Sequence, residues 1–202
     1  MARTGGEERK RSLVAHAVRL FGSLGYDGTS LDSVAEAAGV RKQTLLYYFP
    51  TKEALFEACV EQVGARAAQA LEAALEGPEE GFGRAEAVIR TIFRLTEEWP
   101  EFPTFIREAS RNGPAAVGRI AGTLEPLRKR ALVFLEKEMA EGTFRRQDPT
   151  LLLFTLYTAV VGSVTEAGVL RAVGGGAVGR DALKRREEEL IGFLRVALTG
   201  KN

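Results

Sequence analysis

Histidine and cysteine are almost absent from this chain, which has one of each, His16 and Cys59, among 202 residues. A single cysteine excludes an intrachain disulfide and suits a reducing compartment. One cysteine and one histidine are also too few for a metal site built from these residue types. We therefore expect no enzyme, no cofactor and no metal. His16 is interpreted as a helix-surface residue and Cys59 as a small buried one.

A long apolar segment of the membrane-spanning kind is also missing. The run Pro149–Thr165 carries no charge, but its seventeen residues include four threonines, a serine, a glycine and a proline. A membrane span needs about 20 strongly apolar residues. The segment Met1–Ser12 is charged and polar, unlike a signal peptide, and is expected to be a flexible arm. These patterns predict a cytoplasmic protein without a membrane partner.

Segments with the alternating polarity of a β-strand are absent as well, so the sequence predicts an all-α fold of about nine helices. Glycine and proline punctuate the chain after Lys52 and mark the helix ends. The helices expected in this part cover residues 53–76, 82–99, 102–112, 117–141, 149–172 and 181–198, with a glycine linker at 174–179.

The most informative segment is a short helix, a glycine turn and a second short helix. Ser30 can cap the first helix, and Thr29-x-x-Asp32 is an overlapping start signal. Leu31, Val34, Ala35 and Ala38 then recur at the spacing of one helix face. Gly39 suits a left-handed turn, and a recognition helix is expected over residues 41–49, ending before Pro50. This is the pattern of a helix-turn-helix.

The second short helix presents side chains that a protein in the DNA major groove needs. Cations suit phosphate or guanine, an amide suits adenine, and hydroxyl groups suit phosphate oxygens. The candidate DNA-contacting residues are Ser30, Arg41, Lys42, Gln43, Thr44, Leu46, Tyr47, Tyr48 and Lys52. A solvated helical hairpin would explain the charges, but not the spacing of Ala35 and Gly39.

The segment from about Arg9 to Cys59 resembles the DNA-binding domain of the TetR family of bacterial repressors. The residues that carry the resemblance are Leu24-Gly25-Tyr26, Thr29-Ser30, Val34-Ala35, Ala38-Gly39-Val40, Thr44-Leu45 and Tyr47-Tyr48-Phe49-Pro50-Thr51-Lys52-Glu53-Ala54-Leu55. The chain departs from the family pattern at Leu46, where a tyrosine is usual, and at Gln43, where a small residue is common. The resemblance implies a homodimeric repressor of a palindromic operator, with a C-terminal ligand-binding domain.

Charge is distributed in keeping with this organisation. Residues 1–52 carry eight Lys or Arg against five Asp or Glu, whereas residues 53–202 carry twenty against twenty-two. The basic part contains the helix-turn-helix, where attraction to phosphate would add affinity. We therefore expect a DNA-binding domain at 1–52 and a helical ligand-binding and dimerisation domain at 53–202.

Two C-terminal helices are more apolar than a single small domain requires. A helix that is apolar on all sides is buried on all sides, so these helices predict a dimer interface. Its candidate residues are Tyr157, Val161, Leu190, Phe193, Leu194 and Ala197.

Aromatic residues are frequent in the same part of the chain. Each can be a core residue, but the resemblance implies that some line a pocket for an apolar small-molecule effector. The candidates are Phe93, Trp99, Phe102, Phe105 and Phe154. The alternative is a DNA-binding regulator without a small-molecule effector, constitutive or controlled by a protein.

Overall fold

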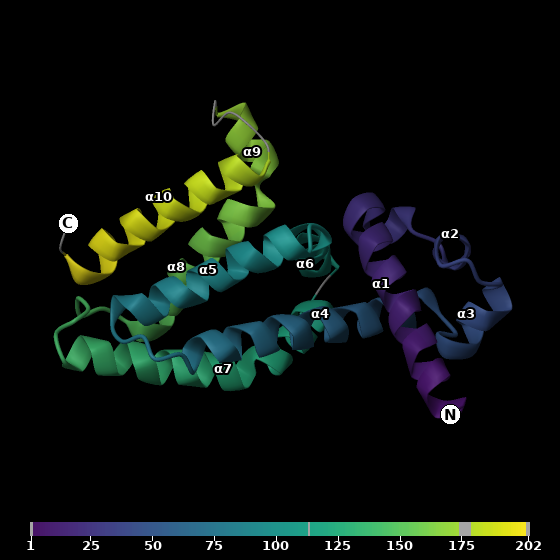
Figure 1. Cartoon of the computed structure of the whole chain (residues 1–202), viewed down its shortest axis with the longest axis horizontal. Helices are drawn as coiled ribbons and strands as arrows, with labels where there is room; N and C mark the ends of the chain where they lie inside the picture. The colour runs from purple at the N-terminus through teal and green to yellow at the C-terminus, as the bar shows by residue number, and fades with distance from the viewer. Residues whose placement is uncertain (1, 113, 174–178, 201–202) are drawn as a thin grey trace. The chain divides into compact units, whose positions relative to one another are not determined.

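The computed structural model describes residues 2–112, 114–173 and 179–200. Within these residues the chain forms ten helices and no strand (Figure 1), so the predicted all-α fold is confirmed. The helices are α1 (Ala2–Gly28), α2 (Leu31–Ala37), α3 (Lys42–Tyr48), α4 (Lys52–Leu75), α5 (Phe82–Glu98), α6 (Glu101–Arg111), α7 (Pro114–Ala140), α8 (Pro149–Thr165), α9 (Ala167–Ala172) and α10 (Arg180–Thr199).

The expected single helix over 149–172 is two helices, α8 and α9, which meet at Glu166. A break exposes carbonyl groups that the continuing helix would have paired. Arg186 of α10 supplies a donor there, because its Nη1 lies 2.8 Å from the Ser163 carbonyl oxygen. Most of the expected glycine linker, residues 174–178, lies outside the described residues.

The N-terminal segment also differs from the expectation of a flexible arm. Residues 2–12 belong to α1, which is a helix from Ala2 onward. The stretch Glu7–Arg11 consists of strong helix formers, which explains why the helix extends beyond its apolar part. The first buried residues of α1 are Leu13 and Val14.

The helices pack as two compact units. Unit 1 contains residues 1–66 and 100–123, and unit 2 contains residues 67–99 and 124–202. This division differs from the expected boundary after residue 52, because α6 packs along α1. Gly22 allows the close approach: a Cβ atom there would lie only 2.8 Å from the Thr104 hydroxyl oxygen.

Aromatic rings fill the centre of unit 1. Phe21 and Tyr26 of α1 both meet Phe56 of α4 edge to face, with ring centroids 5.0 Å apart. Phe105 of α6 packs on the same Phe56 ring at 5.6 Å. Edge-to-face pairs add a specific attraction to the burial of apolar area. The aromatic cluster therefore joins α1, α4 and α6 into one core.

Unit 2 has a core of aliphatic and aromatic residues from α5, α7, α8 and α10. Figure 1 shows α5 and α10 side by side, and both helices contact α8. Phe93, Leu135, Leu152 and Ile191 are buried members, one from each of these four helices. Among the helices described, none is both long enough and apolar enough to cross a bilayer.

Candidate nucleic-acid interface

The start of α2 is fixed by a reciprocal pair of serine hydroxyl groups. The Ser33 amide donates to Ser30 Oγ at 3.0 Å, and the Ser30 amide donates to Ser33 Oγ at 3.0 Å. Ser30 is therefore the cap, as predicted. The overlapping Thr29-x-x-Asp32 signal is wrong, because Thr29 is buried and its hydroxyl donates to the Gly25 carbonyl.

The turn between α2 and α3 has the predicted form. Gly39 adopts a φ of 66°, in the left-handed region that favours glycine. Val34 and Ala35 of α2 are buried on one side of the turn, and Leu45 of α3 is fully buried on the other. Phe49 ends α3 with an extended backbone, the conformation that a following proline favours.

Burial of Leu45 and Phe49 fixes which face of α3 points outward. Arg41, Lys42 and Gln43 are exposed, and Tyr47 is 83% exposed although it is a large aromatic residue. Thr44, Leu46 and Tyr48 are half-buried at the edges of this face. The structure thus brings the predicted α3 residues together on one surface.

An open hollow of about 590 Å³ lies between this surface and the start of α1. Gln43, Thr44, Tyr47 and Tyr48 line one side, and Gly5, Gly6 and Arg9 line the other. A Cβ atom at Gly6 would lie 3.7 Å from the Tyr48 hydroxyl oxygen, so the two helices approach closely. The sequence pattern did not place these residues beside α3, because a flexible arm was expected here.

Two lysines of the candidate interface are already held in place. Lys42 Nζ forms an ion pair with Asp32 Oδ2 at 2.8 Å. Lys52 Nζ lies 4.2 Å from the centre of the Tyr26 ring, within range of a cation–π interaction. Tyr26 in turn donates its hydroxyl to Glu53 at 2.9 Å. Burial, together with this bond to Glu53, raises the pKa of Tyr26 to about 12.

The position of Tyr26 depends on a break in α1. Gly25 has a φ of 77°, and the Tyr26 amide released by the break donates to Glu108 Oε1 of α6 at 2.6 Å. Asn112 also donates to this carboxylate. The sequence pattern around Gly25 gave no sign of Glu108, because 82 residues separate it from Tyr26.

Comparison with known proteins supports the same interpretation of this surface. The profile of the family described as bacterial regulatory proteins, tetR family, matches residues 13–59, which include α2, the turn and α3. Residues 13–59 therefore carry the DNA-binding domain of TetR-family regulators.

Three relatives illustrate how far the likeness extends. The HTH-type transcriptional regulator RutR of Escherichia coli (strain K12) is 28% identical over 155 residues, which are 75% of this chain and 71% of RutR. The negative regulator of the biofilm operon icaADBC, IcaR of Staphylococcus aureus (strain Newman), is 37% identical over 51 residues, 25% of this chain and 27% of IcaR. The structure of AibR in complex with isovaleryl coenzyme A and operator DNA is similar in fold, with a TM-score of 0.74 at 20% identity; the match covers 96% of this chain and all of that one.

Outside the TetR-type DNA-binding segment, the predicted pocket residues do not converge. Phe93 borders a hollow in unit 2, and Trp99 is half-buried. Phe102 and Phe105 are buried in unit 1 and do not border that hollow, so their place in a pocket stays a prediction. Phe154 is 63% exposed on α8 and does not border the hollow either, so its assignment also stays a prediction.

The predicted dimer residues separate into an outer and an inner group. Tyr157, Phe193 and Ala197 are exposed, and Val161 and Leu190 are half-buried. Leu194 is 3% exposed in the core of unit 2, so it cannot contact a second chain and that assignment is wrong. The exposed apolar face of α8 and α10 also includes Leu151, Phe154 and Val196, which were not among the predicted dimer residues.

Proposed function

We propose that this protein is a homodimeric transcriptional repressor that binds a palindromic operator through α3 and is released by a small-molecule effector. The observation that carries the proposal is the outer face of α3, where cations, an amide and an exposed tyrosine lie together over a buried Leu45 and Phe49. A repressor of this kind acts on chromosomal DNA, so we place it in the cytoplasm. The proposal assigns it no catalytic activity.

The residues of this face divide into those that would read bases and those that would hold phosphates. Gln43 offers the amide that pairs with adenine, and Leu46 offers an apolar contact for a thymine methyl group. Arg41 suits guanine or phosphate. The hydroxyl groups of Thr44 and Tyr47 suit phosphate oxygens. Sequence preference would therefore come from Gln43 and Leu46, and from Arg41 where it contacts guanine.

The remaining positive charge lies beside the reading face. Lys52 forms a cation–π contact with the Tyr26 ring, and Lys42 forms an ion pair with Asp32. An exposed ion pair of this kind contributes only about 0–1 kcal/mol, so a phosphate can take the place of Asp32 at little cost. Because the net excess of positive charge is small, we expect two copies to bind together.

The face that would join the two copies is the exposed apolar side of α8 and α10. Phe154 and Tyr157 of α8 and Phe193 of α10 are 63%, 49% and 68% exposed. A contiguous apolar surface in water indicates a partner, and a two-fold dimer covers the same patch on both chains. The dimer would carry two α3 helices spaced by roughly 34–36 Å, about one turn of DNA.

Control by an effector is supported by relatives and by thermodynamic linkage. RutR and IcaR are transcriptional regulators, and the AibR structure contains isovaleryl coenzyme A together with operator DNA. If an effector weakens operator binding by a given factor, operator weakens effector binding by the same factor. A tenfold effect corresponds to about 1.4 kcal/mol.

The proposal is tested by selecting DNA from a random pool with the purified protein and footprinting the selected sites. We expect an inverted repeat, and sedimentation at micromolar concentration should show a dimer. A footprint without any inverted repeat, or a monomer that binds DNA with full affinity, would contradict the proposal.

A thermal-shift screen then distinguishes a regulator with a small-molecule effector from one without, because a ligand that binds only the folded state raises the melting temperature of the protein.

A further inference from the structure

Unit 2 contains a hollow of about 580 Å³ between the end of α4, the middle of α5 and the first turns of α10. It is bounded by small side chains on two helices that are not closely packed: Ala73 and Ala74 on α4, and Ala87 and Thr91 on α5. Sites for small organic molecules usually measure roughly 300–1,000 Å³. The space is therefore large enough for a small molecule.

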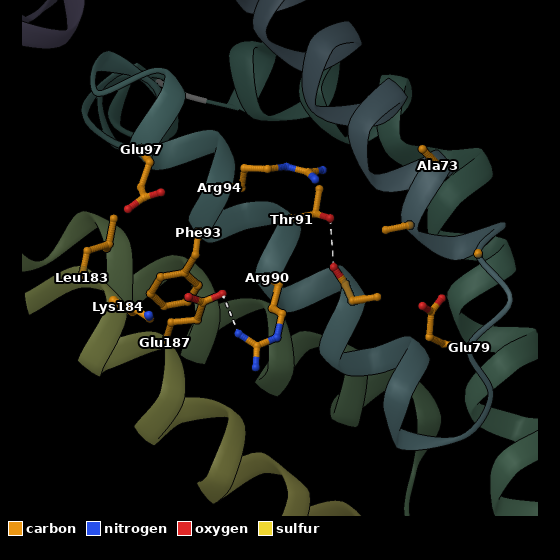
Figure 2. A pocket seen from close by; sticks show the side chains of 13 residues that line it. Ala73, Glu79, Arg90, Thr91, Phe93, Arg94, Glu97, Leu183, Lys184 and Glu187 are labelled. Atoms are coloured by element: carbon orange, nitrogen blue, oxygen red, sulfur yellow. Dashed lines mark hydrogen bonds and ion pairs between the residues drawn. The ribbon is translucent and has the colours of Figure 1, made fainter. Parts of the chain in front are cut away.

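Three cations line this hollow, and one of them is neutralised within the chain. Arg90 donates from Nε and Nη2 to Glu86 Oε1 at 3.0 and 2.8 Å, and its Nη1 lies 3.4 Å from Glu187 Oε1. Figure 2 shows the ion pair with Glu187 as a dashed line. The hydrogen bond to Glu86 is the main reason that the pKa of Arg90 is raised. Arg90 therefore serves the packing of α5 on α10.

The other two cations, Arg94 of α5 and Lys184 of α10, are exposed. In the part of the chain that the structure describes, neither forms an ion pair or a hydrogen bond. Figure 2 labels both side chains at the hollow, Arg94 on α5 and Lys184 on α10. Both charged groups are thus available to a ligand in the hollow.

The three carboxylates on the hollow do not cancel these cations. Glu187 is engaged by Arg90, and Glu97 lies 3.5 Å from Arg180 Nε. Glu79 stands on the far side, after the end of α4 and on the same side of the view as Ala73 (Figure 2). The side formed by α5 and α10 therefore has an excess of unpaired positive charge.

Apolar groups complete the lining. Phe93 and Leu183 are 2% and 9% exposed and border the hollow next to the two cations, while Ala73 and Ala74 border it opposite. We propose that this hollow binds a small organic anion, whose acid group contacts Arg94 or Lys184 and whose apolar body lies along Phe93, Leu183 and the alanines of α4. The inference rests on the proposed function, because it gives the effector a location and a chemical class.

Calorimetry with sodium octanoate as the probe tests this site in the full-length protein. We expect saturable binding, and we expect Arg94→Gln or Lys184→Gln, whichever removes the cation that holds the acid group, to raise Kd about tenfold or more, because hydrogen bonds to charged groups are stronger than neutral ones. Arg185→Gln is the matched control, because Arg185 is exposed on α10 next to Lys184 but does not line the hollow. It should leave Kd unchanged.

A second variant tests the space rather than the charge. Ala73→Phe adds a ring to the α4 wall from an exposed position and should abolish octanoate binding while both cations remain. Octylammonium, which has the same chain length and the opposite charge, should not bind. Equal affinity for octylammonium, or octanoate binding that neither cation variant weakens, would overturn the inference.

Operator binding of the same preparations distinguishes this inference from the proposed function. If octanoate does not bind while the wild-type protein binds a palindromic site, the anion site is refuted and the repressor stands. If the wild-type protein binds octanoate as described but no inverted repeat, the repressor is refuted and the anion site stands. Arg94→Gln and Lys184→Gln should retain the operator affinity of the free protein.

Discussion

The two units of this chain differ in how many large apolar side chains they leave exposed. Unit 1 encloses its aromatic cluster within one chain, and the large apolar residues that it leaves exposed in the described region are Leu24 and Tyr47. Unit 2 leaves eight exposed, of which Leu151, Phe154, Tyr157, Phe193 and Val196 lie on α8 and α10. Exposure of contiguous apolar area is unfavourable in water.

The comparison indicates what kind of partner each unit requires. The exposed face of unit 1 is polar and cationic around Tyr47, which suits a phosphate-lined groove. The exposed face of unit 2 is apolar, which suits a second copy of the same surface. Unit 1 thus encloses most of its large apolar side chains within one chain, whereas the proposed dimer would cover those that unit 2 exposes on α8 and α10.

A charge placed on the apolar face of unit 2 should have the largest effect. We expect Phe193→Glu to convert the dimer to a monomer, because a carboxylate would be buried without a partner in the interface. Operator affinity should then fall at least ~100-fold, since each half-site would be bound alone. Sedimentation and gel-shift titration measure the two effects.

The matched control for that variant is Val133→Glu on α7, where Val133 is 66% exposed outside α8 and α10. It should leave both the dimer and operator affinity intact. If Phe193→Glu remained a dimer, the exposed apolar face of α8 and α10 would not be the dimer interface.

Adding one carbon atom between α1 and α6 should disturb the packing of unit 1. Gly22→Ala would place a Cβ atom 2.8 Å from the Thr104 hydroxyl oxygen and 3.4 Å from the Glu101 carbonyl oxygen. Overpacking of this kind costs about 1–3 kcal/mol, so the free energy of unfolding of unit 1 should fall by that amount. Urea denaturation measures it.

Two further variants check the cause of that loss. Gly122→Ala lies in α7 of the same unit, where an added Cβ atom meets nothing within 4 Å. It should stabilise the protein by about 0.4–1 kcal/mol, because alanine favours the helix. Thr104→Ala should restore part of the stability of Gly22→Ala. No rescue would mean that close approach to α6 is not the reason for the glycine.

The polar face of unit 1 predicts different effects for a reading residue and a phosphate contact. Gln43→Ala should relax the preference at one base pair by about 1–3 kcal/mol. Lys52→Ala should weaken binding to all sequences alike and reduce the salt dependence by about one ion. Titration of operator variants at several salt concentrations separates the two. A changed sequence preference in Lys52→Ala, with overall affinity intact, would reverse the assignment.

The smallest effect concerns the buried thiol of unit 1. Cys59 is fully buried, and burial raises the pKa of its thiol above the ordinary value. Both states keep the proton below the unfolded pKa of about 8.5, but above it only the unfolded state loses the proton. Stability should therefore fall as the pH rises, by about 1.4 kcal/mol between pH 7.5 and 9.5.

Urea denaturation at the two pH values, for the wild-type protein and Cys59→Ala, measures this dependence. The variant should lack most of the decrease, because the raised pKa of Tyr26 affects stability only from about pH 10, where an unfolded tyrosine loses its proton. An equal decrease in both proteins would show that the thiol is not responsible. A thiol reagent should also react with Cys59 only when the protein unfolds.

The DNA-binding surface could be predicted because its signals are local in sequence. Ser30, Gly39 and Pro50 set helix ends within a few residues of themselves, and the spacing of Leu45 and Phe49 identifies the buried face of α3. The partners that hold this surface from afar could not be predicted. Glu108 receives the Tyr26 amide, and Thr104 faces Gly22, and in both pairs about 80 residues lie between the partners.

The sequence by itself determined the helical fold, the position of the helix-turn-helix and the excess of apolar residues on two C-terminal helices. These properties follow from periodicity and from residues that break helices, which act over one or two turns. Only the tertiary structure decided that Phe102 and Phe105 belong to unit 1, that Leu194 is buried while Phe154 is exposed, and that Arg94 and Lys184 share a hollow. The type of a residue does not reveal which distant residues it contacts, because those contacts depend on how the helices pack against one another.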